Sequence, residues 1–344
     1  MKGLLHFKCE NVVRMSNSVN AYWLRVLDTE RYGECDYGKH LLLKYPDAAN
    51  RVQRRNYSIV GRPDEGLIEI AVKRQAGDGV SASIHQSLTR NSILIADEVS
   101  GALTSQSLLR YRRVLMVCGG VGVTLPVGLA RGLAKLAEQG NQVPEVHLIV
   151  CVPQYDDLIY FTELLALQAR YKWLSVATFV TRESVRPGIS YLMSGRPDPC
   201  RLVNQITAPE AILLCGSGAF VADWERQLRC TFPGAMILNQ HRSDTERVPS
   251  SPAASERTCK MLLAGSDRVL IGNRGDTLLE TLEANGVAIS NQCRMGVCGR
   301  CSVRLIEGEV ESSSSIGLTS LELEKGYCLA CCTRPSGEAV TLEL

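Results

Sequence analysis

The sequence predicts a multidomain protein in which an antiparallel β-barrel, a parallel α/β domain and a compact C-terminal unit follow one another. Short alternating segments such as HLLLKY (40–45) and GLIEIAVKR (66–74), separated by Gly, Pro and Asp, are typical of closely spaced antiparallel strands. Beyond about residue 108, continuous apolar runs alternate with helical patterns, which indicates a parallel sheet. At 344 residues the chain is long enough for two or three cores.

The α/β pattern begins at RRVLMVCGG (112–120), a buried strand that ends in glycines, and continues with a predicted helix over 125–140. Further buried strands are predicted in EVHLIVCV (145–152), WLSVATFV (173–180) and AILLCGSG (211–218). Glycines at the carboxyl end of a strand mark the ligand-binding edge of such a sheet. We therefore place the barrel at 1–107 and the α/β domain at 108–241.

The stretch RSDTERVPSSPAASERT (242–258) is rich in Ser, Pro and charge, with little to bury, and predicts a linker over 242–257. The third domain then spans 258–344. It carries a helical pattern, DTLLETLEANG (276–286), just before a loop that is rich in cysteine.

Net charge, apolar runs and cysteine content exclude several classes of function. A formal charge of +2 argues against nucleic acid as a partner. The start of the chain has no signal-peptide pattern, and no run approaches the roughly 18 apolar residues of a membrane helix, so we expect a cytoplasmic protein without a membrane partner. Without an export signal, the 14 cysteines are not expected to form a disulfide framework. Most of them stand singly in apolar surroundings, which is typical of small buried side chains.

The C-terminal cysteines form a group of their own. Three lie within NQCRMGVCGRCSV, at Cys293, Cys298 and Cys301, and GYCLACCTRP offers a fourth at Cys328, Cys331 or Cys332. With Cys331 the pattern is C-x4-C-x2-C-x29-C, the spacing of plant-type [2Fe–2S] ferredoxins. Soft thiolates suit iron and sulfide, and glycines let the loop curl around a cluster. A zinc site is the alternative, but zinc knuckles favour paired C-x2-C units.

A possible flavin motif lies in RRNYSI (54–59), which contains Arg55, Tyr57 and Ser58. An arginine can hold a phosphate through two hydrogen bonds, a tyrosine can pack on a flat ring, and a neighbouring hydroxyl can bond the ring edge. The alternative for Tyr57 is an ordinary aromatic residue of a strand.

A possible nucleotide loop follows the first α/β strand. Gly119, Gly120 and Gly122 stand between that strand and the next helix, where a pyrophosphate can approach the backbone. The alternative is that these glycines only allow a tight turn between the strand and the helix and bind no nucleotide. Cys215, in LLCGSGAFV (213–221), ends a later strand and is equally well explained as a buried core cysteine.

Taken in this order, the motifs carry a family resemblance. Residues 1–241 resemble the ferredoxin–NADP reductase superfamily, and residues 258–344 resemble a plant-type ferredoxin domain. The order is similar to that of the reductase components of bacterial Rieske oxygenases, the phthalate dioxygenase reductase type. The resemblance implies a Greek-key flavin barrel, an α/β NAD(P)H-binding domain and an α+β domain of the β-grasp fold.

The resemblance also assigns roles to residues. Arg55 is expected at the flavin phosphate, Tyr57 against the isoalloxazine and Ser58 at its reactive nitrogen, with Cys215 beside the nicotinamide; Ser58 and Cys215 are thus the expected catalytic residues. Other cofactor-binding residues are expected at Lys73, Gly79, Ser81, Gly119, Gly120, Gly122, Thr124 and Gly216. The cluster ligands implied are Cys293, Cys298, Cys301 and Cys331.

The choice of cofactors follows from details of the same resemblance. GVSASIH (79–85) is similar to the phosphate loop of the FMN-containing branch, which favours FMN over FAD, although DEVSGALTS (97–105) replaces a Pro-x-Asn-x-Phe-like segment. CVPQYDD (151–157) contains acids and no base, which favours NADH over NADPH. Asn239 and His241 stand where related reductases place a carboxylate and an aromatic residue.

The expected function is therefore to pass electrons from NADH through FMN and a [2Fe–2S] cluster to a terminal oxygenase component. One alternative is an FAD-containing NAD(P)H reductase that serves a di-iron hydroxylase or another acceptor. Another, from a different class, is a redox-sensing iron–sulfur flavoprotein.

Overall fold

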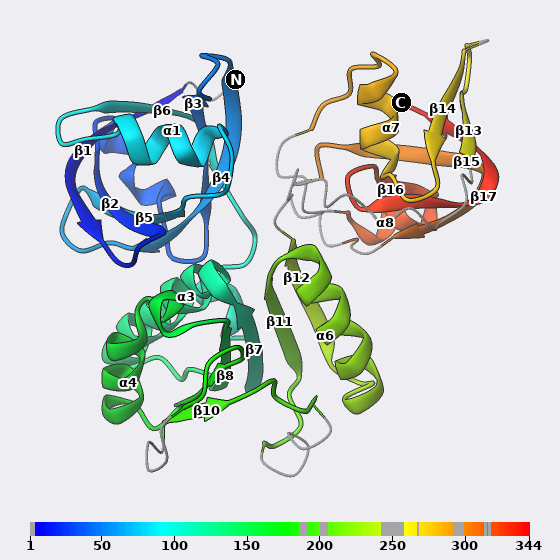
Figure 1. The fold of residues 1–344 in the computed structure, drawn as a ribbon. Coiled ribbons are helices and arrows are strands. Elements are labelled where there is room, and N and C mark those ends of the chain that lie inside the picture. The colour runs from blue at the N-terminus through cyan, green and yellow to red at the C-terminus, as the bar shows by residue number, and fades with distance from the viewer. Residues whose placement is uncertain are drawn as a thin grey trace. The chain divides into compact units, whose positions relative to one another are not determined.

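The computed structural model describes residues 4–185, 191–199, 206–241, 258–266, 268–291, 299–312, 315 and 318–344. The predicted linker, 242–257, lies outside these residues. The chain forms two compact units, 1–238 and 239–344 (Figure 1). None of the helices in the described part of the chain is both long and apolar enough to cross a membrane.

Six antiparallel strands close into a barrel in the order β1-β2-β5-β4-β3-β6. Because β6 returns to lie beside β3, the last four strands form a Greek key, as the resemblance predicts. The strands are β1 (Leu5–Arg14), β2 (Val19–Val26), β3 (His40–Pro46), β4 (Val52–Gly61), β5 (Leu67–Lys73) and β6 (Ile93–Ser100). Short helices join them: η1 (Thr29–Glu34), α1 (Val80–Ser87) and, after β6, α2 (Ser105–Leu108).

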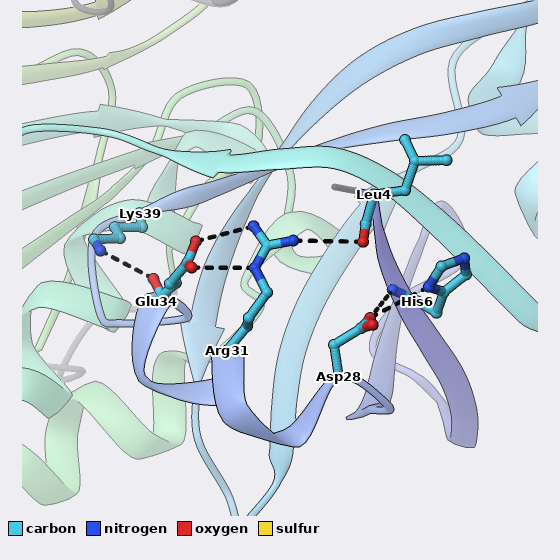
Figure 2. Close-up of polar contacts among 6 residues, drawn as sticks. All are labelled: Leu4, His6, Asp28, Arg31, Glu34 and Lys39. Atoms are coloured by element: carbon cyan, nitrogen blue, oxygen red, sulfur yellow. Dashed lines mark hydrogen bonds and ion pairs between the residues drawn. The ribbon is translucent and has the colours of Figure 1, made fainter. Parts of the chain in front are cut away.

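Polar contacts around η1 fasten the first strand of the barrel (Figure 2). The Asp28 carboxylate accepts a hydrogen bond of 2.6 Å from the backbone N–H of His6, and this bond helps to lower the pKa of Asp28. Arg31 pairs with Glu34 at 3.1 Å and also donates to the carbonyl of Leu4 at 3.4 Å. These contacts stabilise the start of β1 against the loop between β2 and β3.

The second sheet has the order β10-β9-β8-β7-β11-β12, and every pair from β10 to β11 is parallel. Its strands are β7 (Arg113–Gly119), β8 (Glu145–Val152), β9 (Leu174–Val180), β10 (Leu192–Ser194), β11 (Ala211–Gly216) and β12 (Met236–His241). Its helices are η2 (Gly120–Val123), α3 (Thr124–Glu138), η3 (Tyr155–Asp157), α4 (Phe161–Arg170) and α6 (Gly218–Thr231). The central strand β7 is apolar on both faces: Met116 packs in one core and Leu115 in the other. This burial explains the continuous apolar run in the sequence.

Helix α3 joins this sheet to the barrel. It packs against β4, and a methyl group on its Gly128 would lie 2.8 Å from the carbonyl oxygen of Ile59. Val19, Val60 and Ala71 of the barrel belong to the apolar core that surrounds the second sheet. The barrel and the second sheet are therefore parts of one packed unit.

A partly buried ionic network, with Glu69 at its buried end, reinforces the same contact. Arg131 of α3 donates to Glu69 of β5 at 2.6 Å and to Glu163 of α4 at 2.6 and 2.7 Å. The hydroxyl of Tyr160 donates to the other oxygen of Glu69 at 2.7 Å. Burial by itself lowers the pKa of Arg131, but the hydrogen bonds and charges of the two carboxylates outweigh it and raise that pKa. Glu69, whose side chain is only 7% exposed, is thus kept paired with a permanent cation.

The second unit is a mixed sheet in the order β14-β13-β17-β15-β16, in which β13 and β17 are parallel and the other described pairs antiparallel. Its elements are β13 (Thr258–Leu263), β14 (Val269–Asn273), α7 (Leu278–Ala284), β15 (Ser302–Ser312), α8 (Ser320–Glu324), β16 (Tyr327–Leu329) and β17 (Thr333–Glu343). A capping box between Thr277 and Glu280 begins α7, which buries Leu278 and Leu282 against the sheet. This is the α+β arrangement expected of a β-grasp domain (Figure 1).

Gly128→Ala should destabilise the first unit by about 1–3 kcal/mol, because the added methyl group meets backbone rather than a movable side chain. Gly218→Ala is the matched control, since a methyl group at this helical glycine meets nothing within 4 Å. Urea unfolding followed by tryptophan fluorescence measures both, because Trp23, Trp173 and Trp224 all lie in the first unit. Equal unfolding free energies of the two variants would contradict the packing argument.

Arg131→Gln should lower the unfolding free energy of the first unit by about 3–5 kcal/mol, because it leaves Glu69 buried without a cation. The control is Arg170→Gln, which breaks a pair with Glu138 whose side chains are 68% and 51% exposed. Arg170→Gln should lower the unfolding free energy by at most about 1 kcal/mol. A similar small cost for both variants in the same unfolding assay would show that the buried network contributes little.

Candidate functional site

Strand β4 carries the expected flavin residues. Tyr57 lies opposite Leu41 of β3, is 5% exposed and packs with the apolar core of the barrel, whereas Arg55 and Ser58 are half-buried. Arg55 donates from Nη1 to the backbone carbonyl of Arg54 at 2.8 Å, which leaves further guanidinium N–H groups for a phosphate. The contact of Tyr57 with a flavin ring stays a prediction.

The expected second phosphate loop leads into α1. Gly79 precedes the helix, and a methyl group built on it meets nothing within 4 Å, so open space adjoins the first helical turn. The Ser81 hydroxyl accepts from the backbone N–H of Gln75 at 3.1 Å, and the ring of His85 bonds the carbonyl of Val72 at 2.8 Å. The first amides of a helix have no partner within it and favour anions. This loop therefore fits the phosphate of a flavin nucleotide.

Lys73, also expected at the cofactor, lies at the end of β5 and forms an ion pair of 2.9 Å with Asp157 of η3. The neighbouring Asp156 accepts from the backbone and side-chain amides of Asn17 at 3.1 Å each. Both acids of the CVPQYDD segment are thus bonded to the barrel. Their carboxylates therefore serve the contact between the barrel and the α/β sheet.

The glycine loop lies where β7 leads through η2 into α3, and η2 packs against β5 of the barrel. A methyl group on Gly122 would lie 2.9 Å from the carbonyl of Cys215, and one on Gly119 would lie 3.1 Å from the ring of Phe220. These two glycines are required by the close approach of the turn between β11 and α6. Gly120 differs: it has φ +54°, and a methyl group there would point into open space. A nucleotide can approach the backbone at this position.

Cys215 lies next to this loop, near the carboxyl end of β11. It is 3% exposed, and burial raises the pKa of its thiol, so the group stays neutral near pH 7. A methyl group on Gly216 would lie 2.7 Å from the ring of Phe220, and the Ser217 side chain caps α6. Thr124, which begins α3, is 8% exposed. The structure therefore brings Gly122, Cys215 and Phe220 together at the ligand-binding edge of the sheet, and Phe220 is a member that the sequence analysis did not assign.

The described half of the cysteine site consists of Cys301 and Cys331. They are 2% and 9% exposed, and neither forms a disulfide. The N–H of Ala330 donates to the carbonyl of Cys301 at 2.9 Å, so the two cysteine-bearing segments lie side by side, and Gly299 takes a φ of +73° as the chain turns into β15. Two buried, reduced thiols on adjacent segments fit half of a four-thiolate cluster site.

The other two expected ligands, Cys293 and Cys298, lie outside the described residues. Within the part of the chain that the structure describes, no group of three or more His, Cys, Asp or Glu side chains could hold a metal ion. Asn239 and His241 lie on β12, and their side chains are outside the described part of the structure.

Two protein-family models match parts of the chain. Residues 261–336 match the 2Fe-2S iron-sulfur cluster binding domain, and residues 111–193 match the ferric reductase NAD binding domain. The first match covers the positions of all four expected cysteine ligands. The second covers the glycine loop and the strands β7 to β9.

Several known proteins are similar over most of the chain. The stachydrine N-demethylase reductase subunit Stc4 of Rhizobium meliloti is 45% identical over 320 residues, which are 87% of this chain and 86% of the relative. The NADH oxidoreductase HCR of Escherichia coli is 27% identical over 88% of this chain and 87% of its own.

Solved structures share the fold. Phthalate dioxygenase reductase aligns with a TM-score of 0.58 and 19% identity over 99% of this chain and 98% of its own. An intact type IV self-sufficient cytochrome P450 monooxygenase aligns with a TM-score of 0.64 and 20% identity over 99% of this chain, which spans only 41% of that longer protein. The chain therefore belongs to the family of reductase subunits that includes the stachydrine N-demethylase reductase subunit Stc4, and it shares the fold of phthalate dioxygenase reductase.

Proposed function

We propose that this protein takes electrons from NADH and passes them, through FMN and a [2Fe–2S] cluster, to the terminal oxygenase component of a Rieske-type system. The observation that carries the proposal is the combination within one chain of the glycine loop packed against the barrel and two buried thiols in a 2Fe-2S domain. A reductase with only a flavin barrel and a nucleotide-binding domain could pass electrons to many kinds of acceptor. The added cluster domain favours transfer of single electrons to a partner protein.

The named relatives support an oxygenase as that partner. Besides the demethylase reductase subunit, they include glycine betaine monooxygenase reductase subunits and the reductase subunit of a toluene-4-sulfonate monooxygenase system. Potentials agree with this direction of transfer. The reduction potentials of plant-type clusters are about −400 mV, below those of Rieske centres, whose range begins at about −150 mV.

The residues of the first unit have separate tasks. Arg55 and the first turn of α1 would hold the flavin phosphate, and the Ser58 hydroxyl would bond the ring edge. Gly120 admits the dinucleotide to the backbone, while Cys215, a neutral thiol, offers a packing surface without competing as a base or nucleophile. Arg131 and Lys73 fix the barrel against the α/β domain, so that both binding surfaces keep one geometry. The bound cofactors supply hydride acceptance and one-electron transfer.

The direct test is an anaerobic titration of the purified protein with NADH and, separately, with NADPH, followed by visible absorbance. We expect NADH to bleach the flavin and then the cluster, with a much weaker response to NADPH, and FMN rather than FAD in the extracted flavin. Colourless, iron-free protein would contradict the proposal. So would flavin reduction that never reaches the cluster, since the cluster is the proposed exit.

Cys301→Ser should separate the two halves of the electron path. NADH-dependent reduction of ferricyanide, which takes electrons from the flavin, should persist, while reduction of cytochrome c through the cluster should fall at least tenfold. Cys230→Ser is the matched control, because Cys230 is exposed on α6 and far outside the cysteine motif. Parallel loss of both activities, or retention of both, would show that Cys301 does not hold the exit cluster.

A further inference from the structure

The segment that ends the cysteine motif contains two more cysteines than one cluster ligand requires. Cys328, Cys331 and Cys332 are all buried, with exposed fractions of 8%, 9% and 3%. The sulfur atoms of Cys331 and Cys332 lie 3.5 Å apart, within the range of a hydrogen bond between a thiol and a sulfur acceptor. The sulfur of Cys332 therefore lies against the expected ligand.

The local backbone explains how neighbouring side chains come to face each other. Strand β16 ends at Leu329 and β17 begins at Thr333, so the chain turns tightly between them. The N–H of Cys332 donates to the carbonyl of Leu329 at 2.9 Å, which closes this turn. Both thiols belong to the apolar core of the domain, where water does not compete for their hydrogen bonds.

Cys328 occupies a different position. It lies within β16, opposite Val303 of β15, and is 8% exposed. Cys328 is thus a buried thiol of the same segment that lies on the strand, whereas the sulfur of Cys332 lies 3.5 Å from that of Cys331. It serves as a natural control.

We propose that Cys332 donates an S–H···S hydrogen bond to the Cys331 thiolate that ligates the cluster, and that this bond raises the reduction potential of the cluster. The inference rests on the proposed function in one respect: Cys331 must be a ligand. Reduction adds negative charge to the cluster and its sulfur ligands. A donor to one of these sulfurs therefore stabilises the reduced form more than the oxidised form, and hydrogen bonds of this kind are known to set cluster potentials.

The test is an anaerobic redox titration of the full-length protein, in which the reduced cluster is followed by electron paramagnetic resonance after its iron and sulfide have been assayed. Cys332→Ala removes the donor and should keep the iron while shifting the one-electron equilibrium at least threefold toward the oxidised form, which is about 28 mV at 59 mV per decade. Cys332→Ser keeps a donor and should recover most of the potential. Cys328→Ala removes a buried thiol from the same segment but keeps the donor at Cys332, so it should shift the potential less than Cys332→Ala does.

Three results would overturn the proposal. The first is a potential in Cys332→Ala equal to that of Cys328→Ala. The second is an equal drop in the alanine and serine variants at Cys332, because the effect would then not follow the donor. The third is loss of iron in Cys332→Ala with retention in Cys331→Ala, which would make Cys332 the ligand. Absence of iron from the unmodified protein would instead reject the proposed function, and the iron assay separates that result from the other three.

Discussion

The contact between α3 and the barrel is the constraint on which the first unit depends. Gly128 allows the helix to approach the carbonyl of Ile59, and Arg131, one turn further along, holds a carboxylate from β5 and another from α4. The same helix begins directly after the glycine loop. The position of the glycine loop relative to the barrel strands is therefore set by a close backbone approach and by the buried carboxylate of Glu69, which needs Arg131 as its cation.

Much of the fold could be predicted from periodicity. The run 145–152 coincides with β8, and the helix expected over 125–140 is α3, which spans Thr124–Glu138, because buried parallel strands and amphipathic helices leave strong local patterns. The ionic network could not be predicted in this way. Its charges stand alone within apolar runs, as Glu69 does in GLIEIAVKR, and a lone charge shows that a partner is needed without showing which one.

In the candidate site, too, local features could be predicted from the sequence, whereas contacts between distant segments could not. The glycine loop could be located because its position between a strand and a helix is a local property, whereas the role of Phe220 depends on how a distant turn packs against it. The acids at 156 and 157 show what a local motif leaves open: the sequence shows that this segment has no base, but only the fold shows that its carboxylates bond Asn17 and Lys73. Spacing alone also does not separate Cys331 from Cys332, because a slip of one residue changes the spacing very little.

The burial of cysteines in the first unit has a consequence for the reactivity of their thiols. Burial raises the pKa of Cys35 to about 11 and that of Cys151 to about 12. At neutral pH only about one such thiol in ten thousand, or fewer, is a thiolate, which is the form that peroxide attacks. These two thiols are thus held in a chemically quiet form, whereas Cys230, exposed on α6, is open to oxidation.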